Sequence, residues 1–136
     1  MKNSVKAFIA VYAAILLAGC YDRDVVDHKE FDYSLPQIEN LNYTKQANQV
    51  HLTWQIPANI PADFKRPLET QIQVVENDVY KNIVTVGNEI ASADIDIDAS
   101  KEYRFVVRLY GQLTDDAAET GWPEEVYSQS RVIEIR

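Results

Sequence analysis

The stretch IDIDASKEYRFVVRLYG, residues 95–111, decides the fold of this chain of 136 residues. In its first part Ile95 and Ile97 alternate with aspartates, and in its second part apolar residues alternate with mostly polar ones from Tyr103 to Leu109. Such alternation predicts half-buried strands, in which every second side chain faces the core. Because aspartate is a poor strand residue, the aspartates must face water. The stretch therefore predicts two strands joined by a short turn.

The same pattern recurs elsewhere in the chain after residue 36. Val50, Leu52 and Trp54 alternate with polar residues, and Pro57 ends the run. No stretch shows a convincing amphipathic helix of useful length. About seven strands in roughly 100 residues predict an all-β fold, a sandwich of two antiparallel sheets. The other expected strands are residues 38–43, 71–74, 83–86 and 130–136.

Two of these stretches resemble one known family. VHLTWQIP, residues 50–57, is similar to the second strand of a fibronectin type III domain, which implies that Trp54 is the core tryptophan. Residues 95–111 resemble that family's tyrosine corner, in which Tyr103 begins the sixth strand and its phenol bonds to the backbone of the preceding turn. The turn itself departs from the family, where proline and glycine are usual. The resemblance implies an immunoglobulin-like (fibronectin type III-like) sandwich over residues 36–136.

The first twenty residues are of a different kind. Lys2 and Lys6 flank the start of an uncharged apolar run, AFIAVYAAILLAG, which is shorter than the roughly 20 residues that span a bilayer. These features predict a secretory signal peptide over residues 1–19. The motif LAGC, residues 17–20, resembles the lipobox of bacterial lipoproteins, and this implies that Cys20 is lipidated and anchors the chain in a membrane. The alternatives are an ordinary signal peptide or a cysteine buried in a membrane helix.

Residues 20–35 are interpreted as the lipidated cysteine and an acidic tether, because they are dense in charge and lack a clear period. Tyr21, rather than the aspartate that marks inner-membrane retention, follows the cysteine. The acids Asp22, Asp24 and Asp27 resemble, loosely, the surface-export signals of Bacteroidetes lipoproteins; a plain solvated linker is the alternative. We expect a lipid anchor in the bacterial outer membrane, with the domain on the cell surface or in the periplasm.

The composition and the scattered ionisable residues argue against several classes of function. The chain has 21 acidic and 13 basic residues, a net charge of −8. We expect no nucleic-acid partner, because phosphate contacts need clustered positive charge. One cysteine cannot form an internal disulfide. His28 and His51 are isolated, so they predict no zinc site. No Gly-rich phosphate loop and no nucleophile motif are present. We expect no enzyme activity, no metal and no cofactor.

One long connecting segment of the sequence is a candidate for a binding function. Residues 111–128 join the last two expected strands, where a short hairpin would suffice, and long loops in compact domains are usually functional or disordered. Trp122 and Tyr127 could stack on a sugar ring or anchor a protein contact. The alternative is that Trp122 folds back over the sandwich and that the acids only keep the loop soluble. The acids of this candidate ligand-binding loop are Asp115, Asp116 and Glu119.

Three functions remain open at this point. The first is a non-catalytic, membrane-anchored envelope lipoprotein whose sandwich mediates binding or assembly. The second is a glycan-binding accessory of a nutrient-uptake system, which requires an exposed Trp122 beside an aromatic such as Tyr110 or Tyr127. The third is a structural spacer or subunit that packs against other envelope proteins by a poorly protected strand edge.

Overall fold

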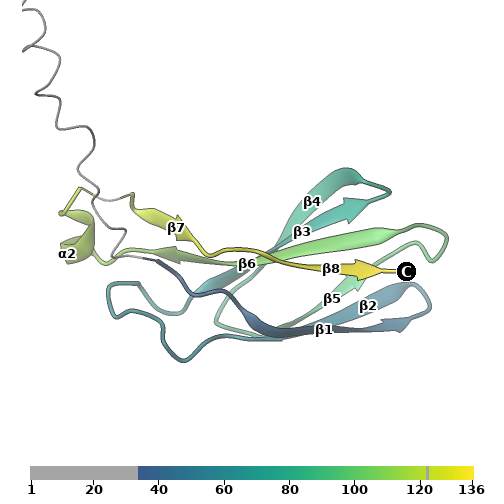
Figure 1. Cartoon of the computed structure of the whole chain (residues 1–136), viewed down its shortest axis with the longest axis horizontal. Helices are drawn as coiled ribbons and strands as arrows, with labels where there is room; N and C mark the ends of the chain where they lie inside the picture. Colours follow the sequence, from purple (N-terminus) through teal and green to yellow (C-terminus); the bar gives the residue numbers. More distant parts are fainter. Residues whose placement is uncertain (1–33, 122) are drawn as a thin grey trace, which may run out of the picture. The chain divides into compact units, whose positions relative to one another are not determined.

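The computed structural model describes residues 34–121 and 123–136 (Figure 1). This part of the chain forms eight strands and one short helix. Their arrangement in two antiparallel sheets confirms the predicted all-β sandwich. The elements are β1 (Glu39–Gln46), β2 (Gln49–Gln55), β3 (Glu69–Glu76), β4 (Val79–Val86), β5 (Ser92–Asp96), β6 (Tyr103–Gln112), α2 (Asp115–Ala118), β7 (Glu125–Tyr127) and β8 (Arg131–Ile135).

One sheet has three strands, in the order β1-β2-β5, and the other has five (Figure 1). In the larger sheet β4 pairs with β3, β3 with β6, and β7 and β8 both pair with the remaining side of β6. Between β7 and β8, the backbone N–H of Leu109 donates to Ser128 Oγ (2.8 Å), and the N–H of Ser128 donates to the Leu109 carbonyl (3.0 Å). The predicted last strand, β8, therefore pairs with the first half of β6, and a short additional strand, β7, pairs with its end. The number of strands is thus eight, where the sequence predicted about seven.

The inner faces of both sheets supply one core. Along β6 the side chains alternate strictly between buried and half-buried, from Tyr103 to Gly111, as the sequence pattern predicts. Trp54 of β2 is 6% exposed and lies in the same core cluster as Phe105 of β6. Leu35, the last residue of the expected tether, is also buried in this core.

The tyrosine corner is present and extends further than the resemblance implied. The hydroxyl of Tyr103 accepts a hydrogen bond from the N–H of Asp98 (2.9 Å) and donates one to Glu76 Oε2 (2.8 Å). Lys101 Nζ reaches the other oxygen of the same carboxylate at 2.8 Å, and Lys81 lies 3.4 Å from it. The turn before β6 is thus tied to the end of β3 by a network of charged groups.

This network shifts the pKa values of its members. The hydrogen bonds from Lys101 and from Tyr103 lower the pKa of Glu76 from 4.5 to about 2. Burial, and then the bond to the Glu76 carboxylate, outweigh the bond from Asp98 and raise the pKa of the Tyr103 phenol. The carboxylate is therefore ionised and the phenol neutral across the physiological range.

The opposite end of β6 is closed by tight packing around Gly111. A Cβ atom on this glycine would lie 3.0 Å from Phe64 Cδ1 and 3.1 Å from Leu68 Cδ2. Next to it, Phe64 and Leu113 form an isolated antiparallel bridge, and both side chains are buried. The chain segment before β3 is thereby held against the end of β6.

Candidate functional site

The connection after β6 is more ordered than the sequence analysis expected. Residues 111 and 112 still belong to β6, and residues 125–127 form β7, so the loop predicted over 111–128 shrinks at both ends. Within it Leu113 and Ala117 are buried in the core. The sequence hid this because β7 is only three residues long and lies in an acidic stretch.

The described members of the predicted ligand-binding set lie on two different elements, the acids at α2 and Tyr127 on β7. Asp115 and Asp116 occupy the first turn of α2, and Glu119 caps its end. Asp115 pairs with Lys65 at 2.9 Å, a surface ion pair that also raises the pKa of this lysine. Trp122, the centre of the prediction, lies outside the described residues, as does the predicted lipidation site Cys20.

Tyr127 belongs instead to a cluster on the outer face of the five-stranded sheet. It stands opposite Tyr110 in the β6–β7 ladder, with the two ring centroids 5.2 Å apart and the planes tilted by 45°. The guanidinium of Arg108 lies over the Tyr127 ring, 4.0 Å from its centroid, and also donates to Gln71 Oε1 (3.1 Å). A cation–π contact of this kind occupies one ring face, so that face of Tyr127 is not free to stack on a sugar.

The phenol of Tyr110 is held on both sides. It accepts a hydrogen bond from Gln112 Nε2 (3.1 Å) and donates one to Glu125 Oε1 (3.0 Å). The bond from Gln112 lowers the pKa of Tyr110, but burial and the Glu125 carboxylate together outweigh it, so that the pKa is raised. The polar side chains around Tyr110 are therefore hydrogen-bonded to each other, and they link β6 to β7.

Exposed apolar side chains gather on the same sheet. Of the seven large hydrophobic residues that are exposed in the described part of the chain, five belong to strands of the five-stranded sheet. Three of these five lie on β4 alone. The five are Val79, Tyr80, Ile83, Tyr127 and Val132, and the other two are Tyr43 and Ile90.

β4 is the edge strand of this sheet and pairs only with β3 (Figure 1). Its ladder is regular from Asn82 to Val86, and a bulge at Lys81 interrupts it before that. The regular part, NIVTV, is uncharged and rich in β-branched residues. Natural edge strands usually carry charges, bulges or covers that prevent pairing with another chain. On β4 the bulge and the single lysine protect only the first half, so residues 82–86 form an unprotected edge.

The other edge strands in the described part of the chain are protected. β5 has five residues, and two of them are Asp94 and Asp96. β1 is irregular between Glu39 and Asn42 and carries Lys45 in its regular half. β7 has three residues. β8 has five residues and carries Arg131 and Glu134, and just before it Gln37 Nε2 donates to the Ser130 carbonyl (2.8 Å).

A groove with a volume of about 510 Å³ adjoins the β4 edge. Residues of β4 and of β5 both line it, so it lies where the edges of the two sheets face each other. Its apolar wall includes Val74, Val84 and Ile95, and its charged groups include Asp94 and Asp96. Because side chains alternate along a strand, a strand added to β4 would place every second side chain in or over this groove.

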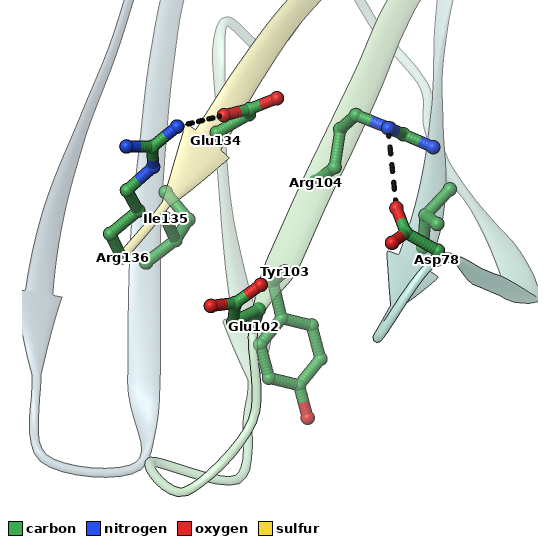
Figure 2. A pocket seen from close by; sticks show the side chains of 8 residues that line it. Asp78, Glu102, Tyr103, Arg104, Glu134, Ile135 and Arg136 are labelled. Atoms are coloured by element: carbon green, nitrogen blue, oxygen red, sulfur yellow. Dashed lines mark hydrogen bonds and ion pairs between the residues drawn. The ribbon is translucent and has the colours of Figure 1, made fainter.

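A second recess, of about 340 Å³, lies at the same end of the five-stranded sheet and shares Tyr103 with the groove (Figure 2). Arg104 pairs with Asp78 (3.5 Å) and Arg136 with Glu134 (3.2 Å). Figure 2 shows the two arginines on either side of the opening, each turned to its own carboxylate. Both carboxylates are more than half exposed, so these pairs are weak and can be exchanged. The recess is thus bordered by two exposed ion pairs.

Neither a metal-binding cluster nor a membrane-spanning helix is found within residues 34–121 and 123–136. No group of three or more histidine, cysteine, aspartate or glutamate side chains there is arranged to hold a metal ion. No helix in that part is long and apolar enough to cross a membrane.

Three comparisons place the chain among known proteins. A family model described as a domain of unknown function, DUF4945, matches residues 20–135. No curated protein matches the sequence significantly. Among solved structures, the spore cortex lytic enzyme SleM of Clostridium perfringens is similar over 72% of this chain, with 15% sequence identity and a TM-score of 0.41. The matched part is 27% of that structure, so the chain spans about a quarter of its length.

Proposed function

The chain belongs to the DUF4945 family, whose function is unknown, and we propose that this member is a non-catalytic, lipid-anchored protein of the bacterial outer membrane. Its sandwich mediates binding or assembly in the envelope. The observation that carries this proposal is the unprotected edge of β4, residues 82–86, in a domain whose other described edges are protected.

The anchor rests on the lipobox motif. The family match begins at residue 20, which is Cys20, the residue expected to become the first of the processed chain. A family boundary at this position supports cleavage there, because a removed signal peptide is not part of the domain. Two or more acyl chains on this cysteine would give a stable membrane anchor.

The binding surface rests on the chemistry of a free strand edge. Backbone N–H and C=O groups along such an edge need partners, and an extended segment of another protein supplies them by adding a strand to the sheet. An added strand would contact Ile83, which is 44% exposed, on its outer face and the adjoining groove on its inner face. The geometry therefore favours assembly by strand addition among the three functions that the sequence left open.

The glycan-binding alternative finds less support in the described residues. It needs a free aromatic face, and the ring face of Tyr127 beneath Arg108 is occupied. Trp122 lies outside the described residues, so a sugar platform built on it stays a prediction.

Three experiments in the native host test the proposal. Cys20→Ser should move the protein from the membrane fraction to the soluble fraction, and protease added to intact cells shows whether the domain faces the medium. A photo-reactive amino acid at Ile83 should crosslink to envelope protein in living cells, whereas the same amino acid at Thr53, on the outer face of the three-stranded sheet, should not. Equal crosslinking at both positions would contradict an edge-specific contact.

A further inference from the structure

We propose that the strand added to β4 is β4 of a second copy of this chain, paired antiparallel around a twofold axis at Val84. This inference rests on the proposed function, because it names the partner of the same edge. The result is a symmetric dimer in which two five-stranded sheets become one continuous sheet.

The charge of the chain restricts where two copies can meet. With a net charge of −8, two copies repel each other. The repulsion opposes a contact least where no acidic residues face each other. Self-pairing of β5 would bring Asp94 and Asp96 close to the same residues of the other copy, which is destabilising. Self-pairing of residues 82–86 brings no two charges together, because this segment has none.

The strands of the five-stranded sheet are also neutral as a set, unlike the rest of the molecule. They carry four basic and four acidic residues, whereas the three-stranded sheet carries one basic and three acidic residues, so the sums are 4 − 4 = 0 and 1 − 3 = −2. A dimer built through the five-stranded sheet therefore pairs strands whose charges sum to zero. The basic residues are Lys81, Arg104, Arg108 and Arg131, and the acidic ones are Glu69, Glu76, Glu125 and Glu134.

The register fixes the axis at Val84. Ile83 and Thr85 are two residues apart, so their backbone N–H and C=O groups point to the same side of the strand. Their side chains also point to the same, outer face of the sheet. An axis at Val84 sets Ile83 of each copy opposite Thr85 of the other and uses all five residues of the regular ladder, Asn82 to Val86. Moving the axis by one residue, to Ile83, would set Lys81, at the bulge, opposite Thr85 and shorten the regular ladder.

The side chains fit this arrangement on both faces. Ile83 is 44% exposed in one copy and would be covered in part by Thr85 of the second. Val84 is half-buried and lines the groove beside β5, so the two copies of this residue would meet at the axis on the inner side. β-Branched residues in directly opposed positions stabilise antiparallel pairs.

Sedimentation equilibrium tests the dimer. The sample is the processed chain from residue 20 with Cys20→Ser, which carries no lipid, at concentrations up to about 1 mM. We expect a monomer–dimer equilibrium, and Ile83→Lys should raise its dissociation constant by about tenfold or more because two lysines would be set into the pairing. The matched control is Val132→Lys, at an exposed apolar position in the same cross-sheet row as Ile83, and it should leave the constant unchanged.

A disulfide trap tests the axis and does not depend on the lysine variant. In the same background, Val84→Cys should form an intermolecular disulfide under mild oxidation, because directly opposed strand positions lie within disulfide range. Val132→Cys should not form one at comparable rate. A thermal melt of each variant shows that it is folded.

The outcomes separate this inference from the proposed function. A monomer at every concentration, or a dimer that Val132→Lys breaks and Ile83→Lys does not, would overturn the pairing of two β4 strands. If the chain is a monomer and the photo-reactive group at Ile83 still crosslinks to envelope protein, the edge binds a different protein and the proposed function stands. If neither the dimer nor the crosslink appears, both fail.

Discussion

The two sheets bury similar inner faces but present different outer faces. On the three-stranded sheet the outward rows contain only amide, hydroxyl, imidazole and carboxylate groups. Among them, His51 Nδ1 is hydrogen-bonded to Asp94 Oδ1 (2.5 Å) and Gln49 Nε2 donates to Asp96 Oδ1 (3.3 Å). On the five-stranded sheet one outward row crosses four strands with three apolar residues and a glutamine, Ile83, Gln73, Val106 and Val132. A face that interacts only with water has no need of that row. This difference supports the proposal that the contact is made by the larger sheet, at its β4 edge.

The largest expected loss of stability comes from changes in the hydrophobic core that the two sheets share. Trp54→Ala, in the three-stranded sheet, and Phe105→Ala, in the five-stranded sheet, should each lower the free energy of unfolding by about 3–5 kcal/mol, because both leave a cavity in one common core. Urea denaturation measures this loss. An unshifted midpoint for either variant would show that its sheet does not depend on the shared core.

The second largest expected loss of stability concerns the packing around Gly111, near the C-terminal end of β6. Gly111→Ala should cost about 1–3 kcal/mol, because the added methyl group meets Phe64 and Leu68 at 3.0–3.1 Å and the neighbours must move. The comparison is Gly87→Ala, where nothing lies within 4 Å of the new Cβ. Thermal unfolding of the two variants should separate them, and equal midpoints would contradict the close approach.

The tyrosine corner gives a similar or smaller effect. Tyr103→Phe removes the acceptor of the Asp98 N–H and a donor to Glu76, and it should cost about 1–3 kcal/mol. The matched control is Tyr43→Phe, at an exposed position of the three-stranded sheet. If both variants unfold at the same urea concentration, the corner contributes nothing to stability.

The same corner predicts a dependence on pH. Because the pKa of Glu76 in the folded protein, about 2, lies below its ordinary value of 4.5, its contribution to stability is fully present above about pH 4.5 and is lost as the pH falls toward 2. Glu76→Gln should flatten the stability curve in this window. A variant whose melting temperature falls with acid as steeply as that of the wild type would assign the acid sensitivity to other carboxylates.

The sequence predicts the inner faces well because period-two alternation reports burial directly. It misses the first half of β4, where the polar residues Lys81 and Asn82 and a bulge break the alternation. A usable signal was present in the dipeptide Asn77-Asp78, whose positive φ angles of 47° and 63° match a two-residue hairpin turn. The candidate site itself is not readable from the pattern, because which strand becomes an edge is decided by the order of strands in the sheet.

Hydrogen–deuterium exchange is the most direct test of the β4 edge as the place of assembly. It compares the amides of β4, residues 82–86, with those of β5, residues 92–96, in the dilute purified protein and in the lipidated protein within native membranes. We expect slower exchange in membranes only for the β4 amides that point away from β3, since an added strand would bond these groups. Unchanged exchange at β4, or protection that appears at β5 instead, would contradict assembly through this edge.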